Sequence, residues 1–169
     1  MPGPALFTAP IMTVEPQWID YNGHLNMAYY NLLFDRCTDA LLAELGLGTG
    51  YVARANASVF TLQAHVGYIR ELHEGDPVRV TFRVLDHDAK RLHAFQEMFH
   101  GEKGFLAATS ETMSLHVDSG LRKSAPFPPA AARRIAAMHR AQKALPSPEQ
   151  AGRQIAIPRP ASTMASTNG

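Results

Sequence analysis

Hydrophobic side chains recur every three or four positions between Met27 and Leu45, which is the spacing of one face of an α-helix. The stripe consists of Tyr29, Leu32, Leu33, Cys37, Ala40, Leu41 and Leu45. Asn26 stands directly before it and is the expected N-cap, because its side-chain oxygen can accept a free N–H group of the first turn. The glycines at positions 46, 48 and 50 are expected to end this helix as a C-cap and turn. They are not expected to bind phosphate, because no helix is expected to follow them.

From Ser58 onward the hydrophobic pattern alternates, which predicts β-strands. Four candidate strands follow, joined by short segments rich in turn-forming residues. They cover residues 59–72, 78–86, 92–99 and 106–117. In the second strand, four apolar residues alternate with Arg79, Thr81 and Arg83, as expected of a sheet with one covered face. One long helix before an antiparallel meander predicts an α+β domain whose sheet wraps that helix.

Shorter elements flank this core. Residues 11–15 form a further candidate strand that ends at Pro16, so the expected sheet has about five strands. Residues 129–145 are expected to form a C-terminal helix on the outside of the domain. The chain beyond it is rich in Pro, Ser, Ala and Gly, and residues 161–169 are expected to be disordered. The predicted organisation is a domain over residues 8–120, a C-terminal helical extension over 121–145 and a flexible tail over 146–169.

Composition narrows the class of protein. The chain has 169 residues, of which 46% are hydrophobic, and this fits one globular domain. Its formal charge of +1 argues against nucleic acid as a partner, because nucleic-acid binders need a broad basic surface. Cys37 is the only cysteine, so no intramolecular disulfide can form. No secretory signal or membrane-spanning stretch is recognised, so we expect a cytoplasmic protein without a membrane partner.

The loop that leads into the long helix offers the clearest chemistry. Between Trp18 and Asn26 it holds a carboxylate, Asp20, together with amides, a glycine and a histidine. A helix N-terminus offers unpaired N–H groups and a partial positive charge, which stabilise an anion or a developing oxyanion. A carboxylate beside it can act as nucleophile or general base. These residues would form a minimal acyl-transfer site, although they would also suit an ordinary polar turn.

The run Asp20-x-x-Gly23-His24-x-Asn26-x-x-x-Tyr30 resembles the 4-hydroxybenzoyl-CoA thioesterase-like branch of the hot-dog-fold acyl-CoA thioesterases. The similarity extends over about residues 14–118, and within that branch the chain is most similar to betainyl-CoA thioesterases. The matching stretches are Trp18–His24, Thr38–Leu42, Lys90–His93, Leu115–Asp118 and Ala151–Arg153. The resemblance implies the hot-dog fold, in which a long central helix is wrapped by an antiparallel sheet.

The resemblance also implies roles for individual residues. Asp20 would be the catalytic carboxylate of a thioester hydrolase, as nucleophile or general base. The backbone N–H of Met27 would be the oxyanion donor, and Asn22, His24 and Asn26 would shape the loop. The substrate would be an acyl-CoA, so that CoA is part of the substrate and no separate cofactor is expected. A homodimer or tetramer would be the working assembly.

The acyl group stays open. Betainyl-CoA enzymes carry a Thr-Glu pair where this chain has Asn26 and Met27, and a quaternary ammonium group needs a carboxylate or an aromatic cage. Tyr21, Tyr29 and Tyr30 are candidates for such a cage.

Four further residues are candidates for substrate binding. Glu111 alternates with apolar residues of its strand and is expected on the covered face, where a carboxylate needs partners or a function. His65 is expected on the opposite row of its own strand, facing a dimer cleft or solvent. Lys90 and Arg91 lie in a turn between strands and could meet the phosphates of CoA, or could simply be solvated.

Other chemistries find no support in the sequence. No Gly-x-Ser-x-Gly element is present, and Cys37 lies within the helical stripe, where a buried, inert thiol is expected. No two histidines have the helical i,i+4 spacing, so no metal is expected. Two alternatives to hydrolysis remain: a CoA-ester hydratase or dehydratase on the same fold, and a non-catalytic protein that binds acyl-CoA.

Overall fold

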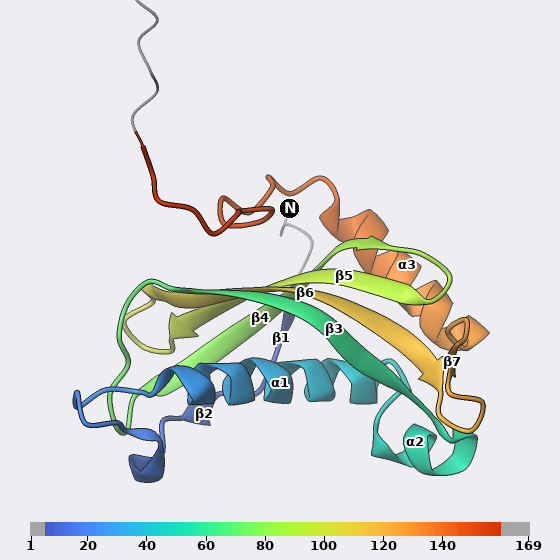
Figure 1. Cartoon of the computed structure of the whole chain (residues 1–169), viewed down its shortest axis with the longest axis horizontal. Helices are drawn as coiled ribbons and strands as arrows, with labels where there is room; N and C mark the ends of the chain where they lie inside the picture. The colour runs from blue at the N-terminus through green and yellow to red at the C-terminus, as the bar shows by residue number, and fades with distance from the viewer. Residues whose placement is uncertain (1–5, 160–169) are drawn as a thin grey trace, which may run out of the picture.

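The computed structural model describes residues 6–159, and its central element is the helix α1 (Met27–Glu44), which runs along one face of an antiparallel sheet (Figure 1). The side chain of Asn26 accepts a hydrogen bond from the Ala28 N–H at 2.9 Å. Along the helix, the side chains of Leu33, Cys37 and Leu41 are buried against the sheet. The predicted long helix and its N-cap are therefore confirmed.

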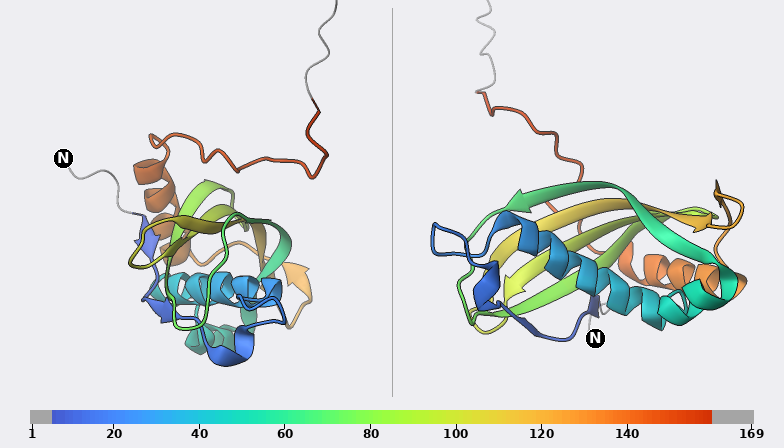
Figure 2. Two further views of the ribbon diagram at one scale, coloured as in Figure 1. Left: turned by 90° about the vertical axis from the view of Figure 1, so that its left-hand side faces the viewer. Right: turned by 60° about the horizontal axis from the view of Figure 1, so that its bottom comes forward.

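Four long strands build the sheet, and three two-residue strands extend it. The long strands are β3 (Ala57–Tyr68), β4 (Pro77–His87), β5 (Arg91–His100) and β6 (Leu106–Asp118). The short ones are β1 (Phe7–Thr8), β2 (Met12–Thr13) and β7 (Lys123–Ser124). The order is β1-β4-β5-β6-β3, with β2 beside β4 and β7 beside β6. The sheet curves around α1, which confirms the expected α+β hot-dog arrangement (Figure 2, right).

The glycine-rich segment after α1 differs from expectation in one respect. A second helix, α2 (Thr49–Ala55), begins within it, with Gly48 as its N-cap residue and Gly50 inside the helix. The prediction that no helix follows these glycines is therefore wrong. This helix has seven residues and none of them is buried, so it has no apolar stripe that could have indicated it. A short 3-10 helix, η1 (Pro16–Trp18), precedes the loop that leads into α1.

The two edges of the sheet are unlike each other. The outer edge of β4 is covered by β1, β2 and the helix α3 (Pro129–Gln142). The side chain of Gln142 accepts a hydrogen bond from the Val84 N–H at 2.9 Å, so α3 completes the hydrogen bonding of this edge. At the other edge, β3 pairs only with β6 among residues 6–159. One edge is closed and the other is open.

Helix α3 belongs to the core more closely than expected. Its residues Ala131 and Ile135 are buried in the same hydrophobic cluster as Leu41 of α1. The predicted C-terminal helix is confirmed, and one of its faces is buried against the sheet. The predicted domain boundaries stay predictions. Residues 161–169, expected to be disordered, lie outside the described part of the chain. No helix within residues 6–159 is long and apolar enough to cross a lipid bilayer.

Candidate active site

The loop before α1 folds back on itself as a tight hairpin. Ile19 and Leu25 form an isolated antiparallel bridge, and the Asp20 N–H donates to the His24 carbonyl at 3.1 Å. Gly23 has a φ of +82°, which glycine adopts at little cost and most other residues do not. The Asn26 N–H donates to the Trp18 carbonyl at 2.9 Å. The hairpin thus ties the segment that carries Asp20 to the first residue before the helix.

The carboxylate of Asp20 is held in place by its own loop. Its Oδ1 atom accepts a hydrogen bond from the Asn22 N–H at 2.8 Å. Its Oδ2 atom takes part in no hydrogen bond or ion pair with residues 6–159. The side chain is half-buried. One oxygen therefore orients the carboxylate while the other is available to a reacting group.

The start of α1 leaves one backbone donor unused. The Asn26 side chain takes the Ala28 N–H, and the Asn26 carbonyl takes the Tyr29 N–H at 3.0 Å. The Met27 N–H makes no hydrogen bond with any residue of the described chain. Since the first N–H groups of a helix have no partner inside it, this group can donate to a substrate oxygen.

These groups open into one cleft, with a volume of about 460 Å³. Seven residues singled out in the sequence line it together: Asp20, Tyr21, Asn22, His24, Asn26, Met27 and Tyr30. Asp20, the first residue of α1 and polar residues of the loop therefore line a single cleft.

Further lining of the cleft comes from the last residue of β3 and the segment that follows it, which the sequence did not indicate. These residues are Tyr68, Ile69, Arg70 and Glu71. The Tyr68 hydroxyl donates to the Met27 carbonyl at 3.3 Å, and the Leu25 N–H donates to the Leu72 carbonyl at 2.7 Å. The sequence prediction continued the strand to residue 72, so these residues were assigned to the sheet. In the structure β3 ends at Tyr68, and the residues after it leave the sheet and lie beside the loop of Asp20.

Two of the predicted cage tyrosines belong to this cleft and one does not. Tyr30 meets Tyr68 edge-on, with ring centroids 5.3 Å apart. Burial raises the pKa of Tyr30, and the nearby carboxylates of Glu71 and Asp20 add to the effect. Tyr21 also lines the cleft but is 96% exposed. Tyr29 stacks on Trp18 instead, with ring centroids 5.6 Å apart.

Glu111 and His65 lie on the face of the sheet opposite α1. Ser110 and Thr112 line a cavity of about 360 Å³ against α1, so Glu111 between them points to the other side. His65 is directly opposite Glu111 in the β3–β6 pairing and shares that face. Glu111 Oε1 lies 2.7 Å from His93 Nε2. In a single chain these residues line a second pocket and not the cleft of Asp20.

The expectation that Glu111 lies on the covered face is wrong because of a bulge. The β5–β6 register shifts beside Ala107, and both Ala107 and its neighbour Ala108 are buried. A bulge reverses the alternation of side chains beyond it. Counting in steps of two from Ala107 therefore assigned Glu111 to the wrong face.

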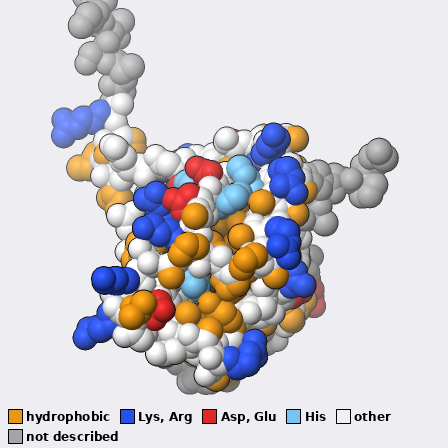
Figure 3. All heavy atoms as spheres, turned by 90° about the vertical axis from the view of Figure 1, so that its right-hand side faces the viewer, with side chains coloured by type: hydrophobic (Ala, Val, Ile, Leu, Met, Phe, Trp, Pro, Cys, Tyr) orange, Lys and Arg blue, Asp and Glu red, His pale blue; other side chains and the backbone are white. Residues whose placement is uncertain are grey.

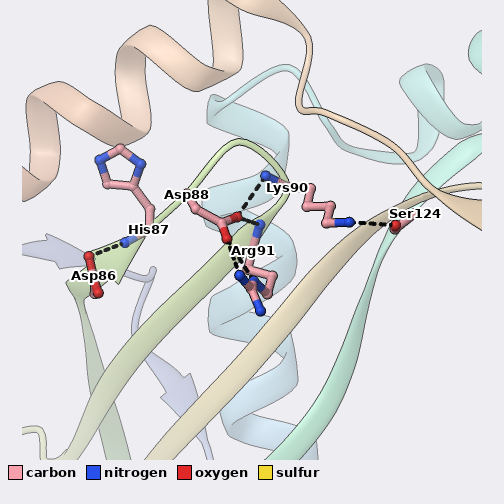
Figure 4. Close-up of polar contacts among 6 residues, drawn as sticks. All are labelled: Asp86, His87, Asp88, Lys90, Arg91 and Ser124. Carbon is pink, nitrogen blue, oxygen red and sulfur yellow. Dashed lines mark hydrogen bonds and ion pairs between the residues drawn. The ribbon is translucent and has the colours of Figure 1, made fainter.

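Lys90 lies in the turn between β4 and β5, and Arg91 is the first residue of β5. This turn is at the far end of α1 from the cleft (Figure 1). The Arg91 guanidinium is paired with Asp88 at 2.6 Å, and the Lys90 ammonium donates to Ser124 at 3.0 Å (Figure 4). Hydrogen bonds from the Lys90 N–H and from Arg91 lower the pKa of Asp88 to about 2. On this end of the molecule, lysine and arginine side chains are spread around the rim rather than gathered in one patch (Figure 3).

Comparisons with known proteins place this architecture in a family. Residues 14–135 match the Thioesterase-like superfamily. The betainyl-CoA thioesterase of Pseudomonas aeruginosa is 42% identical over 145 residues, which cover 86% of this chain and 91% of that enzyme. A Staphylococcus aureus protein solved in complex with CoA superposes with a TM-score of 0.85 at 36% identity, covering 91% of this chain and 96% of that one. A putative thioesterase from Pseudomonas putida superposes with a TM-score of 0.78 at 35% identity, covering 92% and 99% of the two chains. The protein therefore belongs to the Thioesterase-like superfamily.

Proposed function

We propose that the protein hydrolyses an acyl-CoA thioester to the free acid and CoA, with Asp20 as nucleophile or general base and the Met27 N–H as oxyanion donor. One observation carries this proposal: Asp20, which has an unpaired carboxylate oxygen, and Met27, which has an unpaired helix N–H, line the same cleft. The Staphylococcus aureus relative was solved with CoA, and the Pseudomonas aeruginosa relative is named as a thioester hydrolase. Both fit this chemistry.

Two routes lead from this arrangement to products. In the first, Asp20 attacks the thioester carbonyl carbon, the C–S bond breaks, and water then hydrolyses the acyl-aspartyl anhydride. In the second, Asp20 takes a proton from water, the resulting hydroxide attacks, and the tetrahedral intermediate expels the CoA thiolate, which then takes up a proton. In both routes negative charge develops on the carbonyl oxygen. The Met27 N–H, reinforced by the partial positive charge of the helix start, stabilises that charge.

The acyl group that best fits this cleft carries a positive charge. Tyr30 and Tyr68 present aromatic surface, and Glu71 supplies a carboxylate beside them. Aromatic faces together with a carboxylate bind a quaternary ammonium group. Betainyl-CoA enzymes carry a glutamate at the position of Met27, and in this chain Glu71 can supply the acidic group instead. A betainyl-type acyl chain is therefore the proposed substrate.

The proposed assembly is a homodimer in which the open β3 edges of two copies pair antiparallel. β3 begins near α2 and ends at the cleft, where Tyr68 contacts Met27. Antiparallel pairing therefore brings the Lys90 end of one subunit toward the Asp20 cleft of the other. In that assembly Lys90 can meet the phosphates of CoA, whereas Arg91 is already paired with Asp88.

The test is CoA thiol release, followed with a disulfide dye, from a panel of esters. The panel holds betainyl-CoA, its uncharged carbon isostere 3,3-dimethylbutanoyl-CoA, butanoyl-CoA, benzoyl-CoA and the α,β-unsaturated crotonyl-CoA. The variant Asp20→Asn should lower kcat by about a hundredfold or more. Asp39→Asn, an exposed carboxylate of α1 outside the cleft, is the matched control and should leave kcat unchanged.

Each other outcome has a distinct meaning. Near-wild-type turnover by Asp20→Asn would rule out its proposed role. Binding of the esters without any thiol release would indicate a non-catalytic acyl-CoA-binding protein. Consumption of an α,β-unsaturated ester without thiol release would indicate a hydratase.

A further inference from the structure

The chain beyond α3 crosses the outer face of the sheet, which is the face opposite α1. The Arg83 guanidinium donates to the carbonyls of Leu145 at 2.8 Å and Pro146 at 2.6 Å, so the start of this segment is fixed to β4. From there the segment runs from α3 across the sheet toward the β3 side (Figure 2, left). It therefore spans the sheet from the closed edge to the open one.

Glu111 holds this segment near the open edge. Its Oε2 atom accepts a hydrogen bond from the Gly152 N–H at 2.6 Å, while its Oε1 atom pairs with His93. Gly152 has a φ of +72°, so the chain turns at this point. Arg153 and His65 line the same pocket, of about 480 Å³. The next residues of the chain therefore leave the sheet surface beside β3.

The segment beyond Gly152 carries apolar side chains that are exposed to solvent. Ile155 and Ile157 are 93% and 78% exposed. They occupy alternate positions, so in an extended conformation their side chains point to the same side. The adjoining edge strand is exposed as well: Phe60 and Leu62 of β3 are 51% and 55% exposed. Both the segment and the edge strand thus carry apolar side chains that no residue of the described chain covers fully.

The geometry of β3 pairing shows where the segment would lie. If two β3 strands pair antiparallel over their full length, Ala57 is opposite Tyr68, and His65 is opposite Phe60 of the partner subunit. Phe60 pairs with Leu115 of β6 and therefore lies, like His65 and Glu111, on the outer face. Adjacent strands are about 4.8 Å apart, so the partner's β3 is about 10 Å from β6. Three extended residues, from Gly152 to Ile155, span about 10 Å.

We propose that residues 154–159 form an arm that clasps a second copy of this chain, with Ile155 packed on Phe60 of the partner subunit and Ile157 on Leu115 of the partner subunit. Glu111 is the anchor that sets the direction of the arm. This inference rests on the β3-paired homodimer put forward under the proposed function.

Sedimentation of the full-length chain tests the β3-paired dimer and the arm separately. The double variant Ile155→Ser/Ile157→Ser should raise the dimer dissociation constant roughly tenfold or more, because two apolar side chains per subunit lose their contacts. Ile11→Ser is the matched control, since Ile11 is 57% exposed at the other edge of the sheet. A wild-type chain that sediments as a monomer would overturn the dimer and the arm together. A stable dimer whose dissociation constant is the same in the double variant would overturn the arm alone.

Cross-linking between two different single variants locates the contact. The Ile155→Cys protein and the Phe60→Cys protein are mixed, allowed to exchange subunits and then oxidised. Each chain carries only one new cysteine, so a disulfide between these positions can form only between two chains. The native Cys37 is fully buried, and burial raises its pKa to about 12, so it stays unreactive. A disulfide-linked heterodimer is expected, and Ile155→Cys mixed with Ile11→Cys should give none. Equal yields from the two mixtures would contradict the proposed position of the arm.

Discussion

Asn26 has two functions at the residue scale, because it caps α1 and leaves the Met27 N–H free. We expect Asn26→Ala to lower the free energy of unfolding by about 1 kcal/mol, since the Ala28 N–H loses its partner. Urea denaturation measures this loss. Asn26→Asp keeps an acceptor oxygen and should retain most of the stability. A full loss in Asn26→Asp as well would mean that the cap is not the source of the effect.

Glu71 offers a test of substrate recognition. We expect Glu71→Gln to raise the KM for betainyl-CoA about tenfold, which corresponds to loss of one partly desolvated charge contact. For 3,3-dimethylbutanoyl-CoA, which has the same shape and no charge, the KM should not change. Steady-state kinetics with both esters provides the comparison. An equal change for both esters would show that Glu71 supports the cleft without recognising the cation.

The distance along the chain decides which of these residues could be predicted. Asp20, Asn26 and Met27 fall within one short run, so local turn and helix chemistry is enough to bring them together. Glu71 reaches the same cleft only because β3 returns to the start of α1, and a long strand has no local signal that states where it ends. Glu111 shows the complementary difficulty, since one bulge residue reverses the face of every side chain beyond it.

At the scale of elements, we expect the contact between the C-terminal segment and the sheet to depend on pH. Burial alone would raise the pKa of Glu111, but the hydrogen bonds from Gly152 and His93 outweigh it, so the pKa is lowered. A carboxyl group with a lowered pKa stabilises the fold fully above its unfolded value, about 4.3. That contribution is lost as the pH falls through the folded value.

We therefore expect Glu111→Gln to lower the melting temperature at pH 7, and the difference from wild type to disappear as the pH falls below about 4. Thermal unfolding over a pH series measures it. Glu97 is the control of opposite sign, because burial raises its pKa. Glu97→Gln should not lower the melting temperature at pH 7. A constant difference for Glu111→Gln at every pH would mean that its charge plays no part.

The spacing of hydrophobic residues predicted each helix or strand that was long and had one face covered by the core. Helix α1 and the four long strands satisfy that condition, and they were predicted within a few residues. In the short helix α2 no residue is fully buried, and Tyr51 packs only partly against the core. Helix α3 carries only a sparse apolar pattern, with Ala131 and Ile135 inside the core. How these two helices pack depends on the shape of the sheet beside them, and that shape cannot be inferred from the local sequence.

For the whole molecule, the open edge of β3 is the feature with the widest consequences. The cavity between α1 and the sheet is bordered by Thr61 and Ala64 of this strand. Asn31 also lines it and donates a hydrogen bond to the carbonyl of Met27, a residue of the Asp20 cleft, at 3.3 Å. A cavity that borders an unpaired strand, close to the loop proposed to carry the chemistry, would be completed by a second subunit. Activity should therefore require the dimer.

Leu62→Lys tests this requirement, because a charged side chain at an exposed sheet edge opposes strand pairing. We expect the variant to sediment as a monomer and to lose most of its thioesterase activity, with its far-ultraviolet circular dichroism unchanged. Ile11→Lys, at the closed edge, should remain dimeric and active. For the wild-type chain, specific activity should fall on dilution at the concentration where the dimer dissociates. A monomeric Leu62→Lys variant with full activity would show that each chain holds a complete site. The cavity between α1 and the sheet would then serve a purpose other than catalysis.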